Sequence, residues 1–157
     1  MIQAILIAFI LGGAFIRLWI EYLNLKSVSL EVPKEFAELY SASEYARSQK
    51  YLRQTTRLSV TETVFDALVM CVFIVLSGFG IVDAFLRGFE FSELVTGLLF
   101  LGSLSFASWI LGLPFSIYRT FSIEELFGFN KTKFRTFVFD QIKGLALGAA
   151  LGAIVVS

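Results

Sequence analysis

The chain of 157 residues contains no histidine and only one cysteine. Without histidine it cannot build a histidine-based catalytic triad, an imidazole general base or an H-E-x-x-H zinc helix. An all-carboxylate site or a lysine base would be the remaining choices for catalysis. Cys71 cannot form an internal disulfide, and its position in an apolar run is typical of a small buried or lipid-facing residue. Net charge is zero, from 13 basic and 13 acidic residues, which predicts no nucleic-acid partner.

Apolar residues, by contrast, are in excess. They make up 57% of the sequence, give a mean hydropathy of +0.78 and include 18 phenylalanines. A soluble domain of this length would expose too much surface to water to contain so many apolar residues. Because a helix crosses a bilayer with about 20 mostly apolar residues, we expect an all-α, polytopic transmembrane helix bundle that forms a single membrane domain over residues 1–157. The expected spans are residues 2–20, 63–86, 94–118 and 142–157, the last being either a short helix or a truncated one.

Basic residues alternate between the loops. The loops at residues 21–62 and 119–141 are rich in lysine and arginine, whereas the loop between the second and third spans holds only Arg87. The positive-inside rule therefore predicts that both basic loops are cytoplasmic and that the N-terminus lies outside. In the first loop, Glu44 and Arg47 are spaced to pair on a helix surface. We expect an amphipathic helix there, lying on or rising from the cytoplasmic face of the membrane.

Residues 121–143, "FSIEELFGFNKTKFRTFVFDQIK", are polar, charged and aromatic between two apolar stretches. Ser122 and Glu125 have the spacing of a capping box, which predicts a helix that begins at Ile123. Gly128 is suited to end that helix. The sequence thus predicts a tight helix-turn-helix at the cytoplasmic surface.

The last apolar block carries two further patterns. Asp140 and Lys143 are three residues apart and are expected to pair where the helix enters the membrane. Gly144, Gly148 and Gly152 form a small-xxx-small face, which allows close helix packing in a membrane. We favour packing inside the same protein over a dedicated dimer motif.

Two stretches together resemble the signature of the type I CAAX prenyl endopeptidases, which are integral-membrane zinc proteases that cut prenylated proteins. The longer stretch, "LPFSIYRTFSIEELFGFNKTKFRTFVFDQIK", is similar to the family's L-P-[FW]-S-x-Y-x-T-F-x-I-E-E-x-x-G-F-N followed by D-x-I-K. The shorter one, "YARSQKY", resembles the family's Y-x-[KR]-S-[QR]-x-Y. The matching residues that we single out are Pro114, Tyr118, Glu124, Glu125, Gly128, Phe129, Asn130, Asp140 and Lys143, with Tyr45, Ser48 and Tyr51 in the first loop.

The resemblance implies a ring of seven transmembrane helices around a water-filled chamber, with the N-terminus outside, of which the four spans would be a partial set. It implies zinc, held by H-E-x-x-H and a later glutamate in a cytoplasmic domain after the fifth span. No zinc ligand or catalytic residue of that site matches any position here, so the cofactor is expected only in the intact enzyme. The implied partners are the lipid bilayer, the catalytic domain of the same enzyme and a prenylated or membrane-associated protein substrate. The implied location is a prokaryotic plasma membrane or the endoplasmic reticulum.

Within that framework, residues 121–143 would form part of the cytoplasmic rim that carries the catalytic domain. Glu124 and Glu125 would pair with basic residues of that domain or of the first loop.

Two other functions fit the sequence. The chain could be a non-catalytic membrane scaffold that self-associates through its glycine-rich last helix, in which case the open reading frame would stop near Ser157. It could also be a small transporter or channel subunit, in which Asp66, Asp83 and Asp140 would be intramembrane ionisable groups. All three aspartates lie near the ends of expected spans, where an interface position explains them more simply.

Overall fold

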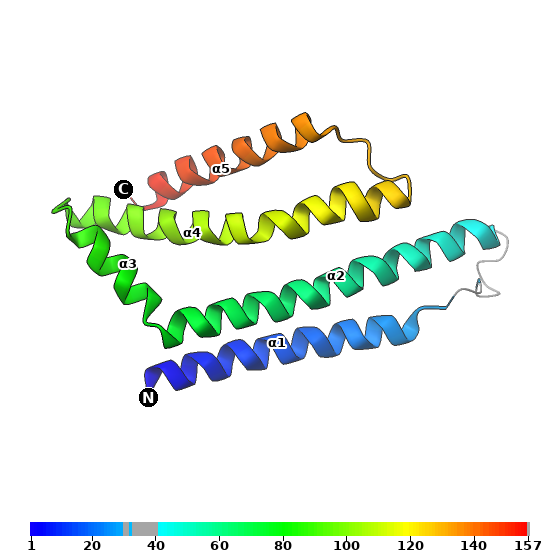
Figure 1. Cartoon of the computed structure of the whole chain (residues 1–157), viewed down its shortest axis with the longest axis horizontal. Coiled ribbons are helices and arrows are strands. Elements are labelled where there is room, and N and C mark those ends of the chain that lie inside the picture. The colour runs from blue at the N-terminus through cyan, green and yellow to red at the C-terminus, as the bar shows by residue number, and fades with distance from the viewer. Residues whose placement is uncertain (30–31, 33–40, 157) are drawn as a thin grey trace. The chain divides into compact units, whose positions relative to one another are not determined.

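The computed structural model describes residues 1–29, 32 and 41–156, and the regular structure in these ranges is entirely helical (Figure 1). The predicted all-α class is therefore confirmed. The helices are α1 (Ile2–Ser27), α2 (Ala42–Val75), α3 (Gly78–Arg87), α4 (Glu93–Tyr118), a π-helical segment η2 (Arg119–Glu124) and α5 (Phe134–Val156).

Four helical stretches are long and apolar enough to cross a membrane, as the sequence predicts. They are Ile2–Ser27, Ala42–Val75, Glu93–Glu124 and Phe134–Ile154. Helix α3 has ten residues, which at 1.5 Å per residue gives about 15 Å, half the thickness of the hydrocarbon core. The chain is thus an integral membrane protein with four candidate spans in its described part.

The chain divides into two compact units. Unit 1 comprises Met1–Val75 and Ile117–Asn130, and unit 2 comprises Leu76–Ser116 and Lys131–Ser157.

The first unit boundary falls inside the apolar block 63–86, which the hydropathy pattern presents as one span. Helix α2 ends at Val75, and Ser77 has φ 55° and ψ 34°. A left-handed residue cannot continue a right-handed helix, and for a residue other than glycine this conformation is costly. Helix α3 then begins at Gly78. Hydropathy does not reveal this break, because it reports which residues leave water and not how the backbone turns.

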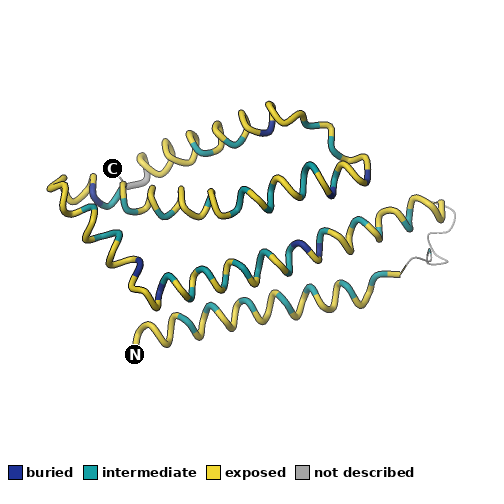
Figure 2. Tube along the Cα trace, viewed as in Figure 1, coloured by how far each residue is buried: buried dark blue, intermediate teal, exposed yellow. Residues whose placement is uncertain are grey.

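In unit 1, α1 and α2 lie side by side (Figure 1). Near one end of the pair, the Gln3 side-chain amide donates a hydrogen bond of 3.3 Å to the carbonyl of Ile74. Helix α1 buries no residue, and most of its length is exposed (Figure 2). Large apolar side chains such as that of Phe9 are among the exposed ones. Such a surface is expected of a helix whose solvent is lipid.

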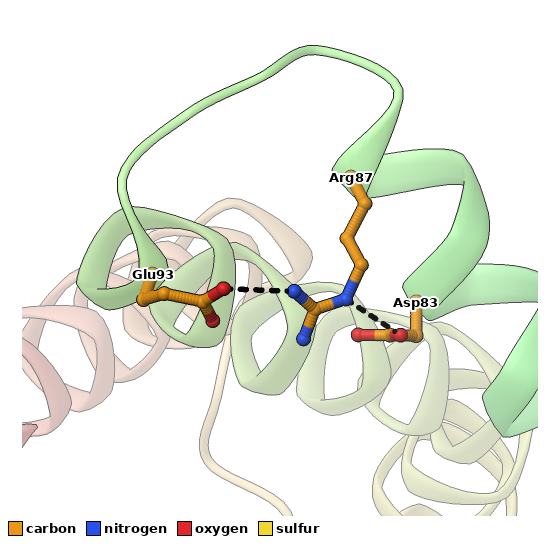
Figure 3. A network of polar contacts seen from close by, with 3 residues as sticks. All are labelled: Asp83, Arg87 and Glu93. Carbon is orange, nitrogen blue, oxygen red and sulfur yellow. Dashed lines mark hydrogen bonds and ion pairs between the residues drawn. The ribbon is translucent and has the colours of Figure 1, made fainter.

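In unit 2, an arginine joins the end of α3 to the start of α4. Arg87 donates hydrogen bonds of 2.9 Å to Asp83 and 3.0 Å to Glu93 (Figure 3). Asp83 first, and then Glu93, raises the pKa of Arg87 further above its usual range, so the side chain remains charged. Asp83 is therefore part of an ion pair and not an isolated charge, which weakens the transporter interpretation at this position.

We expect Arg87→Gln to lower the stability of the intact protein only slightly, because exposed ion pairs contribute little in water. The side chain of Arg87 is 53% exposed, and those of its partners are 43% and 84% exposed. Thermal unfolding in detergent would measure the change, with Arg53→Gln, also exposed, as the matched control. A loss as large as that measured when one partner of a buried ion pair is removed would show that the three side chains are shielded from water in the membrane.

Candidate functional site

The signature residues divide between the two units. Tyr45, Ser48 and Tyr51 lie in the first three turns of α2, in unit 1. The residues at the end of the third span and in the turn after it also belong to unit 1: Tyr118, Glu124, Glu125, Gly128, Phe129 and Asn130. Pro114 on α4 and Asp140 and Lys143 on α5 belong to unit 2. Within unit 1, the structure brings residues of the shorter and the longer signature stretch into contact.

This contact is a group of five residues that we call the rim cluster: Arg47, Tyr51, Phe127, Gly128 and Phe129. The ring of Tyr51 meets Phe127 edge-on at 5.6 Å between centroids and Phe129 at 4.9 Å. Edge-to-face pairs of this kind add about 0.5–1.5 kcal/mol beyond their buried area. The guanidinium of Arg47 lies 5.3 Å from the Phe129 centroid, in cation–π contact. Two segments about 80 residues apart in the chain are therefore held together by aromatic side chains.

Gly128 ends the helical stretch, as the sequence predicts. Its φ is +68°, and its N–H donates 2.9 Å to the carbonyl of Glu125. The carbonyl of Glu124 accepts hydrogen bonds from the N–H groups of Phe129, at 2.8 Å, and Asn130, at 3.2 Å. These bonds satisfy helix-end carbonyls that would otherwise lack partners. The turn thereby places Phe129 against α2.

We expect Gly128→Ala to destabilise the intact protein by about 1–2 kcal/mol, because a left-handed backbone costs roughly that much for a residue with a Cβ. A Cβ here would also lie 2.8 Å from Nη2 of Arg47, which would have to move. The control is Gly12→Ala on α1, where a Cβ meets nothing within 4 Å. Chemical unfolding in detergent would compare the two variants. Equal stability of both would contradict the left-handed turn.

The predicted helix start at Ile123 is wrong. Helix α4 passes through Pro114, continues as η2 and carries Ser122 within the helical stretch. Ile123 and Phe127 are 4% and 7% exposed, so burial of this face maintains the helix where the local capping signal would restart it. Residues in π-helical geometry occur often at functional sites.

The capping box that does form begins α2. The N–H of Ser41 donates to Glu44 Oε2 at 3.4 Å, and the N–H of Glu44 donates to Ser41 Oγ at 3.2 Å. The predicted pair of Glu44 with Arg47 is therefore wrong: the carboxylate turns back to Ser41, and Arg47 turns to Phe129. The S-x-x-E spacing at residues 41–44 was present in the sequence and could have indicated this cap.

Glu124 and Glu125 form no ion pair with the first loop in the described part of the chain, so that half of the prediction is not seen. Glu124 is half-buried and Glu125 is exposed. The ion pair that joins η2 to α2 is instead Arg119 with Glu62, at 2.9 Å. The Nε atom of Arg119 is buried and has no hydrogen-bond partner among the described residues. Sequence reasoning missed this pair, since residues 57 positions apart carry no local signal.

In unit 2, the expected pair of Asp140 and Lys143 does not form: both side chains are exposed, and neither is in an ion pair within the described ranges. Gln141 accepts a hydrogen bond of 2.9 Å from the indole of Trp109, which joins α5 to α4. Beside this bond lies an apolar groove of about 570 Å³. The face formed by Gly144, Gly148 and Gly152 lines the groove, and Cβ atoms there would meet nothing within 4 Å. Within the described residues, the glycines are therefore not in close helix packing.

A polar pocket of about 370 Å³ lies between α1 and α2, lined by Arg17, Glu21, Glu62 and Asp66 among others. Within the described residues, neither this pocket nor any other place gathers three or more side chains that could hold a metal ion. With no histidine in the chain, the residues present do not fit a catalytic zinc site.

Comparison with known proteins identifies the region. Residues 21–157 match the family described as CAAX prenyl protease N-terminal, five membrane helices. A probable CAAX prenyl protease 1 of Schizosaccharomyces pombe is 29% identical over 137 residues, 79% of this chain and 29% of the relative. CAAX prenyl protease 1 of Saccharomyces cerevisiae is 33% identical over 118 residues, 69% of this chain and 26% of the relative. The crystal structure of S. mikatae Ste24p superposes with a TM-score of 0.87 and 26% identity, covering 98% of this chain and 37% of that one. The chain thus spans about a third or less of the length of these curated relatives.

Proposed function

Because this chain belongs to the CAAX prenyl protease N-terminal family, we propose that it is the membrane part of a longer zinc metalloendopeptidase that acts on prenylated or membrane-associated proteins. Its helices would form part of the wall of a chamber, and its rim cluster would support the catalytic part of the same protein. The observation that carries the proposal is the contact between the two signature stretches, through Tyr51 with Phe127 and Phe129, within the region that the family covers.

The residues present support separate roles for this chain and for the rest of the longer protein. The four span-length helices hold the chain in the bilayer and expose apolar side chains to lipid. The zinc of the family, expected outside this chain, would activate the water that hydrolyses the peptide bond. The residues of the rim cluster would keep the aqueous ends of α2 and η2 at a fixed spacing. From the distribution of lysine and arginine, those ends would be cytoplasmic and the N-terminus would lie outside.

The test uses the intact protein, purified in detergent. We expect it to contain zinc and to cleave a prenylated CAAX peptide, and to lose cleavage with a chelator and regain it with added zinc. A matched peptide without the prenyl group measures substrate selectivity. An intact protein that binds no zinc and cleaves neither peptide would refute the proposal and would favour the scaffold interpretation.

A further inference from the structure

We propose that the rim cluster binds a carboxylate from another part of the longer protein, and that Arg47 is the residue that receives it. The inference rests on the proposed function, in which the rim cluster supports the catalytic part of the longer protein. It adds that the contact there is with a carboxylate. It names Arg47 as the contact residue in this chain and a carboxylate as the chemical group in the partner.

Arg47 has a charge that the described part of the chain does not neutralise. No carboxylate there lies within ion-pair distance of its guanidinium. Glu44, three residues earlier on the same helix, is held by Ser41 in the capping box. Arg47 is exposed and has the Phe129 ring at 5.3 Å as its partner. A cation with an aromatic partner and no anion among the described residues can accept a carboxylate without breaking any ion pair described there.

The guanidinium is also held in place before any partner arrives. Its Cζ lies over the Phe129 ring, 5.3 Å from the centroid. Nη2 lies 2.8 Å from the position that a Cβ of Gly128 would occupy, so it approaches the turn more closely than a residue with a side chain would allow. A guanidinium restrained by these two contacts loses less freedom when it forms the two parallel hydrogen bonds that it makes with a carboxylate.

Distance from the bilayer argues against a lipid phosphate as the partner. Even if the second span begins as early as Leu58, Arg47 lies 11 residues before it on the same continuous helix. At 1.5 Å per residue this is about 16 Å along the helix axis. The headgroup layer on each side of the hydrocarbon core is only about 5–8 Å thick. The rim cluster therefore lies in water, where the partner is a polypeptide.

The rest of the longer protein is the polypeptide best placed to supply the carboxylate. This chain covers only 26–34% of the length of its first three curated relatives. A segment tethered within the same molecule has an effective concentration in the millimolar range, so a single charge-assisted contact is enough to keep it bound. Beside Arg47 the cluster exposes an apolar surface, with Phe129 49% exposed. Arginine and aromatic residues together are typical of the residues that dominate protein interfaces.

The test places the photo-cross-linker p-benzoylphenylalanine at Phe129 in the intact protein, and in a second variant at Tyr51. Cross-linked peptides are identified by mass spectrometry. We expect both positions to cross-link to a peptide from outside residues 1–157 that contains Asp or Glu. Arg47→Gln should lower the yield at least fivefold, and Arg47→Lys should lower it less, because lysine keeps the charge without the planar fork. The cross-linker at Phe9, which is 77% exposed on α1, is the control and should label lipid.

Three results would overturn the inference: cross-links from both cluster positions only to lipid or to added substrate, no cross-link outside residues 1–157, or a yield that Arg47→Gln does not change. Cleavage of the prenylated peptide is measured in parallel with the intact protein. Normal cleavage without the cross-link rejects this inference alone. The cross-link without zinc or cleavage rejects the proposed function and leaves the contact standing.

Discussion

Phe127→Ala is expected to destabilise the intact protein by about 3 kcal/mol, within the range measured for removal of a buried phenylalanine. Phe127 is 7% exposed, and its ring meets Tyr51 at 5.6 Å between centroids. Truncation leaves a void between the turn and α2, and also removes the edge-to-face pair. The free energy of unfolding is measured by denaturant titration in detergent, where a lower midpoint at unchanged slope reports stability alone.

Leu126 provides the matched control for Phe127. It is the preceding residue, of similar hydrophobicity, and it is 74% exposed. Leu126→Ala should change the unfolding free energy by less than about 0.5 kcal/mol, as surface substitutions usually do. If both variants lose the same stability, Phe127 does not occupy a buried position, and the contact between α2 and the turn is not formed as described.

The fold class was predictable because hydropathy alone determines it. A helix that crosses lipid needs a long apolar stretch, and each of the four candidate spans contains one. The break at Ser77 was not predictable in this way, since Leu76 and Phe79 on either side keep the block apolar while the backbone at Ser77 turns left-handed. Hydropathy averaged over about 20 residues does not depend on the backbone conformation of any one of them.

The signature residues were found by resemblance, but their contacts were not. Tyr51 and Phe129 each matched the family pattern, and only the structure shows that they touch. Local spacing rules failed where a tertiary contact was available: Arg47 turns to Phe129, although Glu44 lies one helical turn before it. A short-range ion pair on a helix surface is worth only about 0.2–0.5 kcal/mol, so a capping bond or a ring contact easily replaces it.

The ion pair between Arg119 and Glu62 provides a second test of the fold, because its two residues are distant in the sequence and no local pattern predicts their contact. Their side chains are 42% and 33% exposed and 2.9 Å apart, a setting between a surface ion pair and a buried one. We therefore expect Arg119→Glu to cost about 2 kcal/mol, above the value for exposed pairs and below the 3–5 kcal/mol for buried ones. Two carboxylates would then face each other, and Glu62→Arg alone would place two guanidinium groups together.

The charge-swapped double variant, Arg119→Glu with Glu62→Arg, separates the pair from the two positions. If the ion pair joins η2 to α2, the double variant should recover at least half of the loss of either single variant, because opposite charges again face each other. Unfolding of all four proteins in detergent yields the coupling energy as a double-mutant cycle. Additive losses would mean that each residue acts through separate contacts, and the attachment of η2 to α2 would then depend on the rim cluster and the buried Ile123. Recovery would show that this charge pair, whose residues are 57 apart in sequence, helps to hold the two segments of unit 1 together.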